Sequence, residues 1–169
     1  MTFKPHVIEG GLDAPFWKDN PEFRQNILFR GTCWWIYLNP QQRYLGRAYA
    51  WLTTRHVPNH PVHDLAEEEL KELMILLRLY DQTIHALGWN PQLVNYHWDG
   101  NEGHLHDGHG HLHIIPRYAT PPVFDGMTFP DMRFGKNHAP YEKLDLPEGL
   151  FFKIHDRISR EIQYLWRAM

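Results

Sequence analysis

The sequence predicts one α+β domain with about five strands, one long helix and a second helix near the C-terminus. Runs of aromatic and β-branched residues come first, between residues 27 and 54, as expected of strands. Apolar residues at helical spacing then occupy residues 64–88 and 150–165. Between these two segments, five histidines fall within the ten residues His104–His113. The chain of 169 residues is long enough for one hydrophobic core.

Composition excludes several classes of function. The net charge of −3 argues against binding of duplex nucleic acid, because affinity for the phosphate backbone comes mainly from clustered Lys and Arg. No run approaches the roughly 20 apolar residues of a membrane span, and residues 1–30 lack the apolar centre of a signal peptide. We therefore expect a cytoplasmic protein with no membrane partner. The single cysteine, Cys33, predicts a small buried hydrophobic residue rather than a nucleophile.

The first third of the chain predicts an arm followed by strands. Residues 1–26 contain many turn formers and no sustained period, which predicts an N-terminal arm. Residues 27–38 predict a hairpin, because two aromatic and branched runs flank an Arg-Gly pair. A turn at residues 39–42 leads to a further strand over residues 46–54, which ends at Arg55–His56.

Two amphipathic helices are expected. Asp64 and Glu67 match a capping box at the start of the long helix, which ends at Gly88. Its apolar stripe consists of Leu70, Leu73, Leu77, Tyr80, Ile84 and Leu87. Residues 92–96 predict a short strand, and residues 119–147 show no clear period. The C-terminal helix has the stripe Leu150, Ile154, Ile158, Ile162 and Leu165.

The histidine-rich run predicts a strand with a site on one face. In a strand, His109, His111 and His113 point to one side, and Leu112 and Ile114 point to the other. Buried imidazoles need hydrogen-bond partners, so three on one face indicate a site rather than a core. The first and third of these histidines are about 13 Å apart along the strand, so all three cannot bind one zinc ion, although two of them could. An extended phosphate chain suits such a row better, and neutral histidine is a competent nucleophile near pH ~7.

These residues resemble a known family. His109–His113, followed by Ile114–Ile115, is similar to the His-x-His-x-His pattern of the histidine-triad (HIT) nucleotide hydrolases and transferases. Further segments of the chain resemble bacterial HIT proteins in the same order, so that the likeness covers roughly residues 27–141. These segments are residues 35–40, 44–49, 55–57, 116–118 and 134–141.

The resemblance implies a fold and a set of roles. It implies an antiparallel sheet of about five strands, with residues 27–118 as the HIT-like core and residues 119–169 as an extension packed on the same domain. His111 is then the catalytic nucleophile. The other implied catalytic residues are His109 and His113, which orient the nucleophile and bind non-bridging oxygens or protonate the leaving group. His56 is implied to support them from the neighbouring strand. The implied nucleotide-binding residues are Asn39 at the ribose, Asn95 near the phosphates, and Asn101 and His104 in an enlarged phosphate loop.

The loop before the triad departs from the family pattern. A Gly-Gln or Gly-Asn pair usually lies four to five residues ahead of the first triad histidine, whereas Gly100–Asn101 lies eight to nine residues ahead. A second His-x-His, His104–His106, stands between. A triad that began at His104 would have Gly108 in its third position, so we assign the later register.

The expected function is hydrolysis or transfer at the α-phosphate of a dinucleoside polyphosphate or nucleoside phosphoramidate, through a nucleotidyl-histidine intermediate. We expect a purine nucleotide in a cleft between the strands at residues 34–38 and 47–52. No metal is required by this mechanism, and magnesium is expected only with a polyphosphate substrate. The resemblance also implies a homodimer. Two alternatives are a metal-binding or sensing protein that uses the His-rich loop, and a HIT module that binds nucleotides with impaired catalysis.

For several residues the sequence allows two roles or indicates only a structural role. Arg117 either holds phosphate or pairs with an acidic side chain. His97, His138 and His155 have no partner at a meaningful spacing, so they are interpreted as structural.

Overall fold

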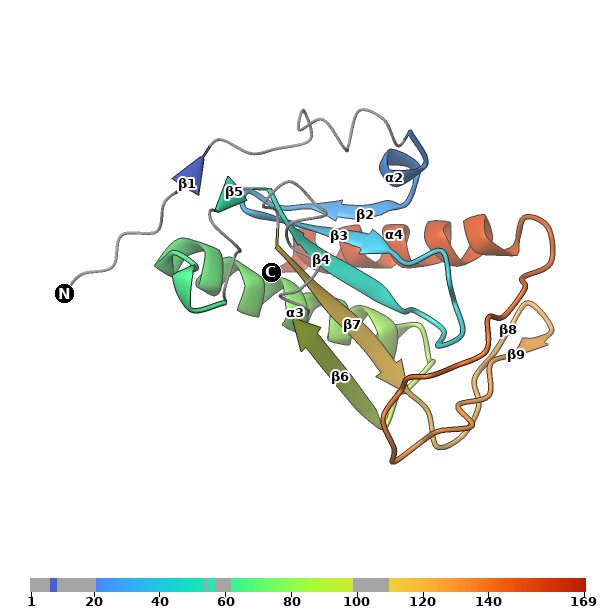
Figure 1. The fold of residues 1–169 in the computed structure, drawn as a ribbon. Helices are drawn as coiled ribbons and strands as arrows, with labels where there is room; N and C mark the ends of the chain where they lie inside the picture. The colour runs from blue at the N-terminus through green and yellow to red at the C-terminus, as the bar shows by residue number, and fades with distance from the viewer. Residues whose placement is uncertain (1–6, 9–20, 54, 57–61, 99–109) are drawn as a thin grey trace.

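The computed structural model describes residues 7–8, 21–53, 55–56, 62–98 and 110–169. At its centre is a five-stranded sheet in which every neighbouring pair is antiparallel (Figure 1). In spatial order the strands are β2 (Ile27–Arg30), β3 (Trp34–Leu38), β4 (Ala48–Leu52), β7 (His111–Arg117) and β6 (Leu93–Trp98). This α+β architecture confirms the predicted fold class.

Both long helices, α3 (Glu67–Ala86) and α4 (Leu150–Ala168), lie on the same face of the sheet (Figure 1). Alternate residues of the central strands form a core with them, because successive side chains of a strand point to opposite faces. From the strands this core takes Trp34, Ile36, Leu38, Ala48, Ala50, Leu52, Leu112 and Ile114. From α4 it takes Ile154, Ile158 and Ile162, all fully buried. No helix in the described part of the chain has the length and apolar character to span a bilayer.

Small elements complete the domain. A short helix, α2 (Pro21–Gln25), precedes β2, and a 3₁₀ turn, η1 (Val62–Asp64), precedes α3. Strands β1 (Val7–Ile8) and β5 (Arg55–His56) form a separate two-stranded sheet. The predicted strand over 46–54 is therefore shorter than expected, and Arg55–His56 belongs to another sheet. The rest of the expected N-terminal arm outside Val7–Ile8 and residues 21–26 lies outside the described residues.

The start of the long helix differs from the prediction. Asp64 lies in η1, and the helix begins after Ala66, whose backbone N–H donates to Glu69 Oε2 at 2.7 Å. The acid three residues into the helix is therefore Glu69 rather than Glu67, because the 3₁₀ turn takes up the residues expected to start the helix. The predicted stripe is confirmed at Leu73, Tyr80 and Ile84, which are buried, but it differs at other positions. Leu70 is 41% exposed, whereas Leu76 and Leu79 are buried.

The segment without a clear period contains a hairpin. Strands β8 (Val123–Phe124) and β9 (Met127–Thr128) pair across Asp125 and Gly126, both of which have positive φ. An Asp-Gly pair between apolar residues is the usual signal of such a turn, because both central positions of a type I′ turn need positive φ. The signal was present in the sequence and the prediction missed it.

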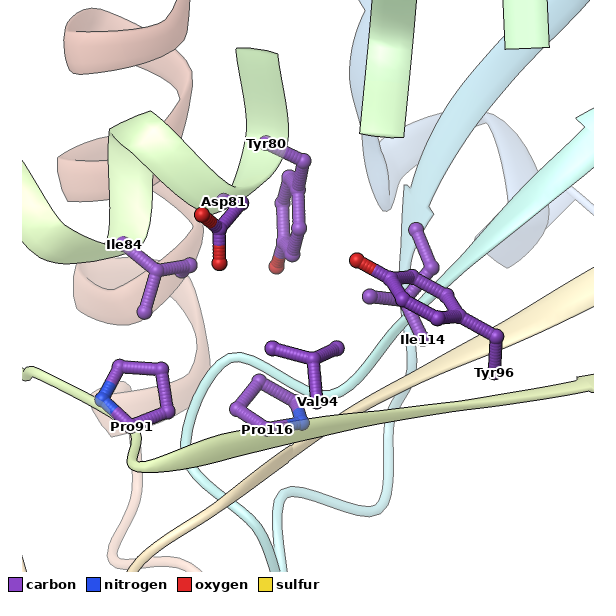
Figure 2. A pocket seen from close by; sticks show the side chains of 8 residues that line it. All are labelled: Tyr80, Asp81, Ile84, Pro91, Val94, Tyr96, Ile114 and Pro116. Atoms are coloured by element: carbon purple, nitrogen blue, oxygen red, sulfur yellow. The ribbon is translucent and has the colours of Figure 1, made fainter. Parts of the chain in front are cut away.

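A small cavity separates α3 from β6 and β7. Figure 2 shows its wall, which is apolar apart from Asp81 and the hydroxyl groups of Tyr80 and Tyr96. Its volume of about 10 Å³ matches one water molecule. It lies on the helix side of the sheet, so it takes no part in a site on the other side.

Candidate active site

The face of the sheet turned away from α3 and α4 carries the histidines of β7, and we call it the histidine face. Register places His111 opposite Trp51 and His113 opposite Tyr49. Leu112 and Ile114 point into the core on the other side. The predicted alternation along the histidine strand is therefore confirmed for positions 111–114, and His109 lies outside the described residues.

His111 and His113 stand side by side at the centre of this face, with ring centroids 5.0 Å apart. The His111 ring stacks on Trp51, with centroids 4.6 Å apart and planes 9° apart. His113 meets the Tyr49 ring edge-on at 4.6 Å. Both histidines are buried, at 4% and 8% exposure. Aromatic contacts of this kind restrict each imidazole to a narrow range of orientations.

One end of the histidine face is aromatic. Phe23, from α2, stacks on Tyr37 with centroids 4.2 Å apart and meets Trp51 edge-on at 5.1 Å. Asn26 donates a hydrogen bond to the Tyr37 hydroxyl at 3.0 Å. Only alternate residues of the two strands at 34–38 and 47–52 can line the nucleotide cleft expected there, because the other residues of these strands are in the core. The aromatic residues that β3 and β4 contribute to this face are Trp35, Tyr37, Tyr49 and Trp51.

The predicted ribose residue, Asn39, is buried at 3% exposure and bonds to the protein itself. Its Oδ1 accepts the backbone N–H of Gln41 at 2.7 Å, and its Nδ2 donates to the Tyr49 hydroxyl at 2.5 Å. Asn39 therefore stabilises the turn after β3 and also reaches the residue that contacts both histidines. Asn95, half-buried on β6, lies opposite Ile115.

The other predicted site residues either belong to a different sheet or lie outside the described residues. His56 pairs with Val7 across β5 and β1, rather than extending β4. Asn101 and His104 lie outside the described residues, as does His106 of the second His-x-His. Within the residues that the structure describes, no three His, Cys, Asp or Glu side chains gather as metal ligands.

Two histidines that sequence spacing left aside also reach this face. His97 on β6 is the register partner of His113 on β7. The buried ring of His138, from the segment after β9, lies 4.4 Å from the His97 ring. The two rings are therefore in contact with each other, although their spacing in the sequence indicates no partner. Spacing could not reveal this contact, because it joins positions on elements separated by the whole of β7.

Arg117 anchors that segment. Its guanidinium forms two bonds with the Asp131 carboxylate, at 2.6 and 3.1 Å, and both side chains are buried. It also donates to the backbone carbonyls of Arg133 and Lys136. Of the two interpretations of Arg117, the acidic partner is therefore the observed one.

Two titratable side chains near these elements have shifted pKa values. Burial, followed by the charge of Asp131, raises the pKa of Tyr44, whose hydroxyl donates to the His138 carbonyl at 2.7 Å. Burial and the Glu72 carboxylate raise the pKa of the Cys33 thiol to about 12. Cys33 is half-buried and packs against the core, so the prediction of an unreactive hydrophobic residue agrees with its surroundings.

The architecture was compared with that of known proteins. No family model and no curated protein matches the sequence. Among solved structures, a hypothetical histidine triad nucleotide-binding protein from Sulfolobus tokodaii strain7 superposes with a TM-score of 0.58 and 16% identity, over 89% of this chain and 93% of that one. The fold is HIT-like. In this HIT-like fold the paired histidines His111 and His113 occupy one strand at the centre of the sheet.

Proposed function

We propose that this chain binds nucleotides and cleaves or transfers them at the α-phosphate, with His111 as the nucleophile. The observation that carries the proposal is the pair His111 and His113, adjacent on one buried face and fixed by Trp51 and Tyr49. The HIT-like fold supports it, since one solved structure of this fold is described as a hypothetical histidine triad nucleotide-binding protein.

The proposed reaction has two steps. A neutral His111 imidazole forms a bond to the α-phosphorus while the bond from phosphorus to the leaving group breaks, and its electron pair departs with that group. Water, or an acceptor alcohol, then breaks the P–N bond and releases the nucleotide product. His109 and His113 orient the phosphate and supply the leaving group's proton, with His56 in support. Asn39, Asn95, Asn101 and His104 are proposed to hold the nucleotide.

The proposed substrates are dinucleoside polyphosphates and nucleoside phosphoramidates. No metal is needed for attack by an imidazole, and magnesium is proposed only as a companion of a polyphosphate. A cytoplasmic location is part of the same proposal.

Rapid quenching tests the intermediate. A phosphoramidate, which forms with a nucleotidyl-histidine, survives alkaline quenching and is lost in acid. We expect such an adduct on His111, and mass spectrometry of alkaline digests locates it. An adduct on His104 or His106 would show that the upstream His-x-His is the working pair. Nucleotide binding without any adduct or turnover would favour the catalytically impaired alternative, and absence of binding to AMP and GMP in calorimetry would remove the nucleotide proposal.

The pH dependence provides a second test. Attack needs a neutral imidazole, and departure of the leaving group is helped by a protonated neighbour, so turnover should be bell-shaped between about pH 5 and 8. A rate that rises steadily to pH ~10 would instead indicate attack by metal-bound hydroxide.

We also propose a homodimer, formed through α3 and the edge strand β6. A groove of about 520 Å³ lies between them and is lined mainly by apolar side chains, including the exposed Met74 and Tyr96. Met74→Glu should shift the protein from dimer to monomer in sedimentation experiments. Ile75→Glu is the matched control, because Ile75 is also exposed on α3 but does not line the groove. A wild-type monomer at all concentrations would remove this proposal.

A further inference from the structure

The histidine face has a second end, opposite to the aromatic end, where several cationic and polar side chains converge. Ring contacts lead from His111 to His113 at 5.0 Å, and from His97 to His138 at 4.4 Å. Register joins the two pairs, because His97 and His113 are Cα partners on neighbouring strands and side chains at such positions are in contact range. The row of imidazoles therefore continues across the sheet, beyond the strand that carries the predicted triad.

Arg47 adds a fixed positive charge at this end. Its guanidinium lies over the Tyr141 ring at 5.0 Å and donates to the Tyr141 hydroxyl. The Tyr141 ring is in turn 6.2 Å from the ring of His138. Arg47 is only 5% exposed, yet its Nε has no hydrogen-bond partner among the described residues. A buried charged donor without an acceptor is costly, so an anion held beside the Arg47 guanidinium would be favoured.

The charge balance of this end favours an anion. The nearby carboxylate of Asp131 is already bonded twice to Arg117. By contrast, Arg47 forms no salt bridge within the described part of the chain. Imidazolium and guanidinium groups bind phosphate oxygens through charge-assisted hydrogen bonds.

The same end continues into an open groove of about 330 Å³. Tyr44 and Tyr141, which flank His138 at 6.5 and 6.2 Å, form part of its wall. Arg43 and Arg133 line it further out, together with one acid, Glu142. A phosphate chain that passed His138 would therefore meet two more guanidinium groups.

We infer that His97, His138 and Arg47 form a second phosphate subsite, which holds the leaving group's phosphates while His111 attacks the α-phosphorus. The inference rests on the proposed function and deepens it. It predicts that the protein prefers substrates whose leaving group is a phosphate chain, such as dinucleoside polyphosphates. Phosphoramidates, whose leaving group is an uncharged amine, should be poorer substrates. When the bond to the α-phosphorus breaks, the electron pair remains on the bridging oxygen of the chain held by this subsite.

A substrate comparison tests the subsite. The variants are His138→Asn and His97→Asn, and the control is His85→Asn, which changes an exposed histidine on α3. The readout is the ratio of kcat/KM for diadenosine tetraphosphate to kcat/KM for an adenosine phosphoramidate. We expect each site variant to lower this ratio by about tenfold or more, since a charge-assisted hydrogen bond is lost for one substrate only. The control should leave the ratio unchanged. An unchanged ratio in both site variants would overturn the inference.

Binding of inorganic tripolyphosphate separates this inference from the proposed function. Calorimetry should show that the wild type binds tripolyphosphate and that His138→Asn weakens this binding by about tenfold or more. If the wild type turns over neither nucleotide but binds tripolyphosphate in this way, the subsite stands and the proposed reaction fails. If the wild type is active but tripolyphosphate binding is absent or insensitive to both site variants, the reaction stands and the subsite fails. Thermal unfolding of each variant verifies that it is folded. If His138→Asn does not fold, His97→Asn replaces it in both experiments.

Discussion

The two faces of the five-stranded sheet are made of alternate residues from the same strands, yet they are held together by different forces. On the helix face, aliphatic side chains of β3, β4 and β7 pack against α3 and α4. On the histidine face, rings meet rings, and the contacts include Phe23 from α2 and His138 from the segment after β9. The helix face is stabilised by buried apolar area, whereas the histidine face depends on the orientation of individual polar rings. Substitutions of apolar side chains on the helix face should therefore act mainly on stability, and substitutions of the rings on the histidine face should act mainly on activity.

The largest effect should come from His111, the proposed nucleophile. His111→Asn is expected to lower turnover by on the order of 10⁴-fold or more, because no other side chain replaces the attacking atom. Nucleotide affinity should stay within a few-fold, since the bond to phosphorus exists only along the reaction path. Single-turnover kinetics and calorimetry measure the two quantities. Near-normal turnover of this variant would show that His111 is not the nucleophile.

Next is the ion pair that holds the segment after β9. Asp131→Asn should lower the free energy of unfolding by about 3–5 kcal/mol, because it leaves the buried Arg117 guanidinium without its counter-charge. Asp125→Asn is the matched control, since Asp125 pairs with Lys153 at the surface. Its effect should be below about 1 kcal/mol. Equal losses in urea denaturation would show that burial does not distinguish the two pairs.

A smaller loss of stability is expected on the helix face. Ile114→Ala removes a buried side chain next to His113 in sequence but on the opposite face, and should cost about 2–4 kcal/mol of unfolding free energy. Activity per folded molecule should change much less than in His111→Asn. A loss of activity as large as that of the nucleophile variant would mean that the two faces are not separable.

The smallest effect concerns a potential nucleophile on the helix side. The Cys33 pKa of about 12 lies above that of an unfolded cysteine, so the native thiol is protonated at neutral pH and becomes a thiolate only as pH rises toward that value. At pH ~8, iodoacetamide should label Cys33 roughly a hundredfold or more slowly in the native protein than in urea. Glu72→Gln should speed native labelling, because the Glu72 carboxylate helps to raise this pKa. Rapid labelling of the native wild type would contradict both expectations.

Sequence periodicity predicted the helix face well. The hairpin of β2 and β3, the helices α3 and α4, and the alternation of β7 all follow local patterns of apolar residues, which a single segment contains in full. Errors in this part were shifts of a few residues, as at Ala66, where a 3₁₀ turn moved the helix start.

The histidine face was predicted only where one strand carries it. His111 and His113 follow from alternation along β7, but His97 and His138 meet only because β6 pairs with β7 and Arg117 binds Asp131. Such contacts depend on tertiary distances between segments without a shared period. The same reason explains why Phe23 over Tyr37 was not foreseen. The functional roles of all the predicted site residues stay predictions, namely those of His111, His109, His113, His56, Asn39, Asn95, Asn101 and His104.

The junction of β2 and α4 has a consequence for biosynthesis. His155 Nε2 donates to the Ile27 carbonyl at 3.0 Å across 128 residues of chain, and the Phe29 ring meets that of Trp166 at 5.2 Å. At ordinary rates of translation the ribosome needs on the order of ten seconds to make the intervening chain. Until α4 emerges, the apolar side of β2, which packs against α4, has no cover on the nascent chain. Chains terminated before residue 150 should therefore be bound by chaperones or aggregate, so the domain forms its complete core only after translation of α4.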